Sequence, residues 1–393
     1  MQPNPGPATN ARATTLARVR IAEGSGRGAL WIGAAATLIG AAVLAASCCQ
    51  VPARSDRPLA RVAEPLQVDG ALELARRHAP WIFHETDDCG GRQDLPTRVD
   101  FDGNLRGDDD WENFAAFELP PVVYYAVVAT ETHWFLSYHL FHPRDWCHYD
   151  VLLHMTHEND GENLQVVVER ATDRVVLLLT QAHYRAYAHA PADAGFAAAA
   201  EPLDAELVQV DDEGRPSPAG AHPCVVVAAR GHGIEELATD DDVVATLARG
   251  APDFRGRGVI LRPPRASAAD GVAPPLAEPS PRAPAPVEYA LASTVATFWA
   301  GVRDGDLVGD GKTFDGPLRL ATPELTVAVP RYYDADRTSG PFGPDRGISP
   351  FALDFRFCEG ECGALLFDPA RRYAACLRVP QPWSTRYVDF PWR

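Results

Sequence analysis

The feature of this sequence that most constrains its fold is a series of short apolar runs rich in β-branched and aromatic residues. These runs are Val122–Thr130 (VVYYAVVAT), Trp134–Phe141, Gln165–Glu169, Arg174–Thr180 and Val225–Ala229. Helical patterns are few and short: Gly70–His78, with Asp69 as its expected N-cap, Asp241–Arg249 and Tyr289–Arg303. Strands at this spacing predict a mainly β fold, a β-sandwich with a few short helices and long surface loops.

The N-terminal part of the chain has the pattern of an export signal. Gly28–Ser47 is an uncharged apolar run, and it follows a stretch that contains several arginines. The run ends in Ala45-Ala46-Ser47-Cys48, which resembles a bacterial lipobox in which Cys48 is lipidated. The alternative is an uncleaved anchor, since about 20 apolar residues span a bilayer. Both interpretations predict that the rest of the chain lies outside the cytoplasm.

We therefore expect three parts in the chain. Residues 1–47 form the export signal or anchor, 48–68 a tether, and 69–393 a single β-sandwich domain with a proline- and alanine-rich surface excursion at 263–287. The formal net charge of −17 argues against nucleic-acid binding, which needs a basic surface. No motif indicates a protein partner.

The cysteine content agrees with an oxidising compartment. Six cysteines follow the N-terminal pair, namely Cys89, Cys147, Cys224, Cys358, Cys362 and Cys376. They allow three disulfides, in a pairing that the sequence does not define. The alternative is a zinc site at Cys358, Cys362 and Cys376, but no histidine follows His232 to complete it nearby.

Histidines and carboxylates concentrate in one stretch of the chain. The segment His157-Glu158-Asn159-Asp160-Gly161-Glu162 leads into an expected strand, where alternation places Asp160 and Glu162 on one face. His157 can fold back over that face, and Asp145 lies across the preceding loop. Three carboxylates and one imidazole suit Ca²⁺ or Mg²⁺ better than Zn²⁺. A solvated acidic loop is the alternative interpretation.

The order of these segments resembles the superfamily of necrosis-inducing (NPP1-type) and Vps62-like proteins. That family carries a Gly-His-Arg-His-Asp-Trp-Glu signature that runs into a strand, preceded by an aspartate. The residues that fall on these positions are Asp145, His157, Asp160 and Glu162. Asn159 and Gly161 replace the second histidine and the tryptophan, which argues against cytolytic activity. The chain is more similar still to uncharacterised bacterial envelope lipoproteins with a HEND-x-E segment.

The resemblance implies a β-sandwich with a divalent cation at one rim, which in the toxin branch helps to bind sugar headgroups of membrane lipids. Trp146, His183 and His232 are the expected ligand-binding residues beside it. We expect an exported, lipid-anchored module of the bacterial cell envelope that binds a glycan or a lipid headgroup. The alternatives are a metal-dependent hydrolase, in which His183 or His232 transfers protons, and a structural envelope protein.

Overall fold

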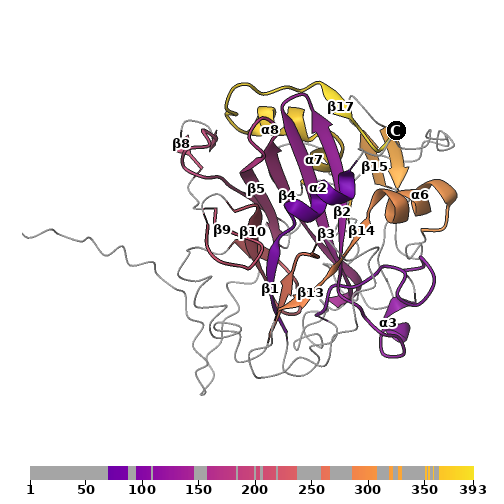
Figure 1. Ribbon diagram of the computed structural model, residues 1–393. Coiled ribbons are helices and arrows are strands. Elements are labelled where there is room, and N and C mark those ends of the chain that lie inside the picture. Colours follow the sequence, from indigo (N-terminus) through magenta and orange to yellow (C-terminus); the bar gives the residue numbers. More distant parts are fainter. Residues whose placement is uncertain are drawn as a thin grey trace, which may run out of the picture. The chain divides into compact units, whose positions relative to one another are not determined.

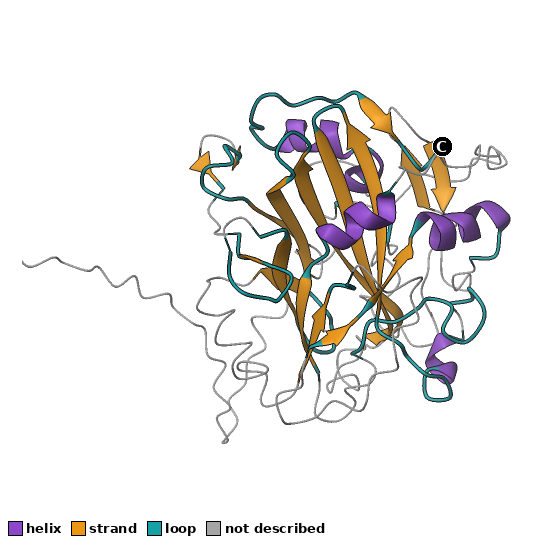
Figure 2. Cartoon of the chain, viewed as in Figure 1, coloured by secondary structure: helices purple, strands orange, loops and turns teal. Residues whose placement is uncertain are grey.

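Two β-sheets dominate the fold, and they are built from segments far apart in the chain. The computed structural model describes residues 70–86, 94–107, 109–145, 157–182, 185–198, 201–203, 207–217, 220–236, 258–265, 286–307, 318–321, 326–329, 350–351, 353–354, 357 and 363–393. All of these residues belong to one unit, Ala45–Arg393. Figure 2 shows that strands greatly outnumber helices among them. The expected mainly β, sandwich-type fold is confirmed.

The larger sheet has seven strands in the order β14-β2-β3-β4-β5-β6, with β17 also paired to β2. Figure 1 shows β2, β3, β4 and β5 as neighbouring arrows. Their bounds are β2 Val122–Thr130, β3 His133–Asp145, β4 His157–Glu169, β5 Arg174–Ala182, β6 Arg185–His189, β14 Ala290–Ser293 and β17 Tyr387–Asp389. The β2–β14 pair is parallel, and the other pairs in this sheet are antiparallel.

The smaller sheet has the order β11-β10-β1-β12-β13, with β9 paired to β10. Its strands are β1 Trp81–Glu85, β9 Gln209–Val210, β10 His222–Val227, β11 Ile234–Glu236, β12 Gly258–Arg262 and β13 Val287–Glu288. Two short hairpins pair β7 Ala197–Ala198 with β8 Glu201–Pro202, and β15 Leu318–Ala321 with β16 Thr326–Val329. The helices are α2 Ala71–Arg77, α3 Asp110–Asn113, η2 (a π-helix) Val295–Trp299, α6 Ala300–Asp304, α7 Ala364–Phe367 and α8 Pro369–Cys376.

The larger sheet is covered on both faces, which explains why β2 and nearly all of β5 are buried on both faces. One face packs on the smaller sheet, through residues such as Val123, Leu136 and Val166 against Ile82 and Val225. The other face packs on η2, α6, α7, α8 and the C-terminal segment, through residues such as Tyr124, Phe135, Phe298, Tyr373 and Trp392. All nine residues of β2 are buried, as expected for a continuous apolar run rather than an alternating one.

Two local expectations are wrong. Tyr289–Arg303 was expected to be a single helix, but Ala290–Ser293 forms β14, whose backbone pairs in parallel with β2, and helical structure begins at Val295. Pairing along the free edge of β2 outweighs the modest helix propensity of this segment. The N-cap of α2 is Gly70 rather than Asp69, and its left-handed φ of 79° suits a glycine.

Cys224 does not fit the expected set of three disulfides. It is a thiol with 1% of its surface exposed, inside an apolar cluster with Trp81 and Phe83 on the outer face of the smaller sheet. Its small apolar side chain fills that cluster, which is a common role for a buried cysteine. Pairing among the other cysteines stays a prediction, because most of them lie outside the described residues.

The expected N-terminal signal, the tether, the helix at Asp241–Arg249 and residues 266–285 of the 263–287 excursion also lie outside the described residues. Among the helices that the structure does describe, none has the length and apolar character needed to cross a membrane.

Polar side chains, among them His139 and Asn163, are buried on the face of the larger sheet that the helices cover. They predict that acid destabilises the fold. His139 Nδ1 lies 3.1 Å from Asn163 Oδ1, and the His139 ring meets the edge of Phe298. Burial lowers the pKa of His139 to about 3, so the folded protein holds this ring neutral where an unfolded histidine would take up a proton. A buried neutral histidine therefore contributes stability above pH 6.5, and this is lost as pH falls from 6.5 toward 3.

We expect the free energy of unfolding to fall with decreasing pH below 6.5, by about 1.4 kcal/mol per pH unit for each such histidine. The variant His139→Gln should lose one of these contributions and show a correspondingly smaller slope. Urea unfolding at pH 6.5, 5.5 and 4.5 measures both slopes. Equal slopes in the two proteins would show that His139 does not titrate differently on unfolding.

Candidate functional site

A cluster of three histidines and two aspartates lies where the two sheets meet at one end. His142 of β3 and Asp160 of β4 are directly opposite each other in the antiparallel register. His84 comes from β1 of the smaller sheet, His232 from the turn between β10 and β11, and Asp94 from the loop that follows β1. Five separate segments, between residues 84 and 232, thus supply one cluster.

His232 joins the two carboxylates. Its Nδ1 lies 2.7 Å from Asp160 Oδ2, and its Nε2 lies 3.3 Å from Asp94 Oδ1. The backbone N–H of Arg230 also donates to Asp94 Oδ1, at 3.0 Å. The side chains of His232 and Asp94 are fully buried, and that of Asp160 is 14% exposed. The only side of this trio that reaches solvent is therefore the Asp160 side.

The other two histidines pack against this trio. The His142 ring stacks on His232, with centroids 3.7 Å apart and an angle of 8° between the ring planes. His84 Nε2 lies 3.1 Å from His142 Nε2, and His84 Nδ1 lies 2.7 Å from the carbonyl oxygen of Glu85. Both rings are fully buried.

The three imidazoles differ in charge because their neighbours differ. Burial by itself would lower the pKa of His232, but its hydrogen bonds with Asp160 and Asp94 outweigh burial and raise the pKa to about 9. Burial, and then the nearby His232 cation, lower the pKa of His84 to about 4 and that of His142 well below its usual value. At neutral pH, His232 is the cation, and His84 and His142 are neutral.

The backbone around the cluster adopts conformations that side chains usually avoid. Five non-glycine residues in the described part of the chain have a positive φ, and three of them flank this site: Asn159 at 55°, Arg230 at 72° and His232 at 46°. Asn159 tolerates this geometry, and its amide donates to the carbonyl of Gly107. Such residues cost roughly 1–3 kcal/mol each and concentrate at functional sites. The strain therefore supports a functional role for this end of the sandwich.

Three members of the cluster are residues of the kind that could hold a metal ion. His142, Asp160 and His232 each offer one ligand atom, and these atoms all lie within 4.8 Å of one another. A donor set of two imidazoles and one carboxylate suits divalent first-row metals. Asp94 is hydrogen-bonded to His232 and His84 to His142, as second residues commonly are to metal-binding histidines.

The structure places part of the sequence-predicted metal set in this cluster. Asp160 belongs to it. Glu162 lies two residues further along β4, opposite Leu140, and is 5% exposed. Asp145 ends β3 opposite His157. Among the described side chains, neither Asp145 nor Glu162 joins the group of close ligand atoms. The side chain of His157 is outside the description, so the full four-ligand set stays a prediction.

Of the expected ligand-binding residues, His232 lies at the centre of the cluster, whereas Trp146, His183 and the lipidation site Cys48 fall outside the described residues. Sequence reasoning missed His84, Asp94 and the role of His142. His142 stands in the histidine-rich stretch and could have been found there, but its neighbours could not. His84 is embedded in an apolar strand, and Asp94 follows in a loop without any motif.

A second group of carboxylates lies near α3. Ligand atoms of Asp102, Asp109 and Asp110 also lie within 4.8 Å of one another. Asp102 accepts hydrogen bonds from the side-chain amides of Asn104 and Asn113, at 2.8 and 2.7 Å. Asp109 is the N-cap of α3, and Asp110, its first residue, is fully buried.

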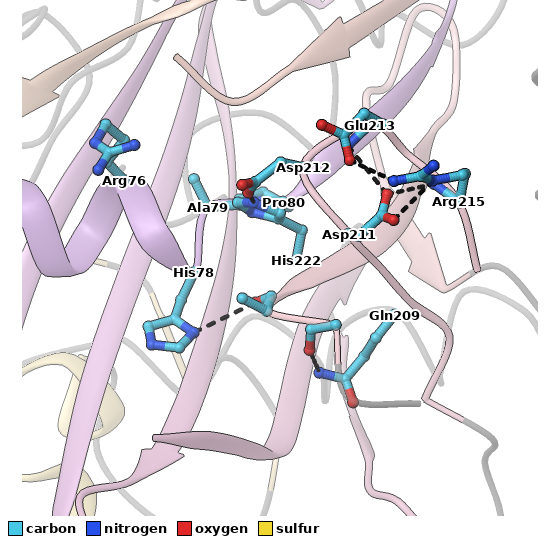
Figure 3. Close-up of polar contacts among 12 residues, drawn as sticks. Arg76, His78, Ala79, Pro80, Gln209, Asp211, Asp212, Glu213, Arg215 and His222 are labelled. Carbon is cyan, nitrogen blue, oxygen red and sulfur yellow. Dashed lines mark hydrogen bonds and ion pairs between the residues drawn. The ribbon is translucent and has the colours of Figure 1, made fainter. Parts of the chain in front are cut away.

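The His222-Pro223-Cys224 segment, where β10 begins, has a structural role. His222 lies 2.7 Å from the carbonyl oxygen of Ala79 and 2.9 Å from the exposed carboxylate of Asp212, linking β10 to the chain before β1 (Figure 3). The neighbouring Asp211 accepts hydrogen bonds from the backbone and guanidinium of Arg215. This carboxylate run therefore forms a hydrogen-bonded turn.

Comparison with known proteins gives only distant structural likeness. No family model matches the chain, and no curated protein matches it. Similar solved structures include one titled "Toxin fold for microbial attack and plant defense", at 17% identity and a TM-score of 0.27, covering 48% of this chain and 78% of that one. NLPPya in complex with mannosamine has 18% identity and a TM-score of 0.27, covering 48% and 77%. The non-toxic HaNLP3 protein has 15% identity and a TM-score of 0.28, covering 46% and 75%.

These neighbours are necrosis- and ethylene-inducing toxins and their relatives, the group that the sequence resemblance named. TM-scores of this size carry no conclusion about site or activity. The class that the fold and site define is a β-sandwich protein with a histidine–aspartate cluster at one end of its two sheets.

Proposed function

We propose that this protein is an exported, lipid-anchored module of the bacterial cell envelope that holds a divalent cation at the His142–Asp160–His232 cluster and uses it to bind a glycan or a sugar-bearing lipid headgroup. The observation that carries the proposal is the convergence of three metal-ligand atoms from three separate segments within 4.8 Å. Two carboxylates, Asp94 and Asp160, supply the negative charge that a dication needs, and the ion would displace a proton from His232, because an imidazolium has no lone pair to donate.

Accessibility supports a binding role. His142 and His232 are fully buried, and of the three candidate ligands only Asp160 has an exposed edge. An ion here would meet a ligand from the Asp160 side, where sugar hydroxyls can complete its coordination. The alternative, a metal-dependent hydrolase, needs a cleft beside the ion for substrate and water. The burial of His142 and His232 favours holding an ion over turning over a substrate.

Anchoring through Cys48 and location outside the cytoplasm belong to the same proposal. They are supported by the apolar run at Gly28–Ser47 and the lipobox-like Ala45-Ala46-Ser47-Cys48. No described residue bears on them, so they are supported by the sequence alone.

Cation binding should be visible as stabilisation. After removal of metals with EDTA, a divalent cation at 100 times its Kd should raise the free energy of unfolding by about 2.7 kcal/mol. Melting curves with Ca²⁺, Mg²⁺, Mn²⁺ and Zn²⁺ measure the effect. Asp160→Asn should abolish this stabilisation. Asp212→Asn, which replaces an exposed carboxylate outside the cluster, should leave it unchanged.

The ligand is tested with the cation that stabilises the protein. A glycan array, and vesicles with and without glycolipid, should retain the protein in that cation and release it in EDTA, and Asp160→Asn should not be retained. Stabilisation by a cation without EDTA-sensitive retention would reject the glycan part alone. No stabilisation by any of the four cations would reject the whole proposal.

A further inference from the structure

We propose that the segment carrying α3 forms a second sugar subsite, in which Trp111, Phe114 and Phe117 present an aromatic surface that stacks on an uncharged pyranose ring. We call these three residues the aromatic strip, and the described residues 94–107 and 109–121 around them the α3 loop. The inference rests on the proposed function and deepens it, because it makes the ligand an uncharged oligosaccharide rather than a single sugar or a phosphate-bearing headgroup.

The α3 loop is attached beside the candidate site. The amide of Asn159, the residue before Asp160, donates to the carbonyl oxygen of Gly107. On the neighbouring strand β3, the Arg144 guanidinium donates to the carbonyl oxygen of Trp111 at 2.5 Å. Strands β3 and β4 thus both hold the loop, next to the one candidate metal ligand that solvent reaches.

The aromatic strip is held in place before any ligand binds. The guanidinium carbon of Arg144 lies 3.9 Å from the ring centroid of Trp111 and 3.5 Å from that of Phe114, so one cation packs on two rings. Phe117 meets Phe101 edge-on, with centroids 6.3 Å apart and 75° between the ring planes. Rings fixed in this way lose little conformational entropy when a ligand binds.

Phe117 is the exposed end of the strip. It is 39% exposed, and it is one of only four large hydrophobic residues that are exposed in the described part of the chain. Ala115 and Ala116 beside it are exposed as well, and their small side chains leave room next to the ring. The C–H groups of a pyranose ring form an apolar face, and stacking that face on Phe117 removes apolar surface of both partners from water.

Polar groups on the same loop suit the hydroxyl groups of a sugar. Asn113 stands between Trp111 and Phe114 in the sequence, and its amide donates to Asp102 Oδ2 at 2.7 Å. This bond fixes the orientation of the amide relative to the carboxylate. Amide and carboxylate oxygens in a fixed orientation are acceptors to which sugar hydroxyls can donate.

The charge of the loop favours an uncharged ligand. Ligand atoms of Asp102, Asp109 and Asp110 lie within 4.8 Å of one another, and Glu118, next to Phe117, is exposed. These carboxylates repel phosphate, sulfate and uronic acid groups. A membrane contact is disfavoured too, since insertion at a bilayer surface needs a larger apolar face flanked by basic residues.

The dependence of affinity on glycan length tests the second subsite. Calorimetric titration of the purified full-length chain, with its stabilising cation present, compares cellohexaose, mannohexaose and chitohexaose with their monosaccharides and with hexagalacturonic acid. At least one uncharged hexasaccharide should bind about 10-fold or more tightly than its monosaccharide, because the strip adds contacts to a second ring. Hexagalacturonic acid should bind more weakly than that hexasaccharide.

Variants of Phe117 assign the effect to the strip. Phe117→Leu keeps an apolar side chain but loses the flat ring, so hexasaccharide affinity should fall by about 5–30-fold, with monosaccharide affinity and stabilisation by the cation unchanged. Phe117→Tyr keeps the ring and should bind normally. Tyr187→Leu makes a similar change at a 45% exposed aromatic residue on β6 and should have no effect. Melting curves confirm that each variant folds.

The outcomes separate this inference from the proposed function. Equal affinity for both sugar lengths, or an unchanged hexasaccharide affinity in Phe117→Leu, rejects the second subsite, while Asp160-dependent retention on glycolipid vesicles keeps the proposed function. Loss of binding to sugar-free vesicles in Phe117→Ala, with sugar affinity unchanged, would make the loop a membrane contact and also rejects the subsite. If no sugar of either length binds and glycolipid vesicles do not retain the protein, both proposals are rejected.

Discussion

The variant His232→Asn is expected to lower the free energy of unfolding by about 3–5 kcal/mol in metal-free buffer, because it leaves two buried carboxylates without their cation. Asp94 is fully buried and Asp160 is 14% exposed, and each contacts a different nitrogen of His232. Asparagine is the suitable replacement, since it tolerates the left-handed φ of 46° at this position. The loss then reports charge rather than backbone strain.

Urea unfolding of two further variants identifies the cause. Asp94→Asn combined with His232→Asn removes one uncompensated charge and should recover part of the loss, giving a favourable coupling in a double-mutant cycle. Asp212→Asn removes the exposed partner of His222 and should cost less than about 1 kcal/mol. A loss below 1 kcal/mol in His232→Asn would mean that the carboxylates are not held by this imidazolium.

The second large effect is expected in the C-terminal segment. Trp392 is fully buried, and its ring meets Trp299 at 5.6 Å and Phe367 at 5.1 Å between centroids. Trp392→Ala should therefore lower the free energy of unfolding by about 3–5 kcal/mol, the usual range for truncating a buried aromatic residue. Thermal and urea unfolding measure the change.

Val388 provides the matched control on the same segment, since it lies on β17 and is 53% exposed. Val388→Ala should change stability by no more than about 0.5 kcal/mol. If both variants behave alike, the C-terminal segment does not unfold together with the sandwich.

Pattern in the sequence was enough to predict elements whose environment is uniform along their length. The strand Val122–Thr130 was predicted with its observed bounds, because an uninterrupted β-branched and aromatic run suits a strand covered on both faces. The helix expected from Tyr289 failed because its first half pairs with β2, and a single sequence does not record which distant edge remains free.

In the candidate site, too, only the part that depends on local spacing could be predicted from the sequence. Asp160 was predicted because its spacing within one strand is local information. The pairing of Asp160 with His142 depends on the β3–β4 register, and the approach of His84 depends on how the two sheets pack. The Asp94 contact depends on a loop conformation. None of these has a signal in local spacing, so the donor set could be predicted only in part.

The central position of β1 has a consequence for how the protein folds. β1 lies between β10 and β12, and the hydrogen bond between Ala79 and His222 spans 143 residues. The Tyr289 hydroxyl reaches Pro80 across 209 residues. Contacts of such long sequence separation form slowly, because a large loop must close before they yield any energy. A nascent chain must therefore leave β1, the first strand of the described residues, unpaired until the later strands have been synthesised, and we expect this strand to be prone to aggregation during that interval.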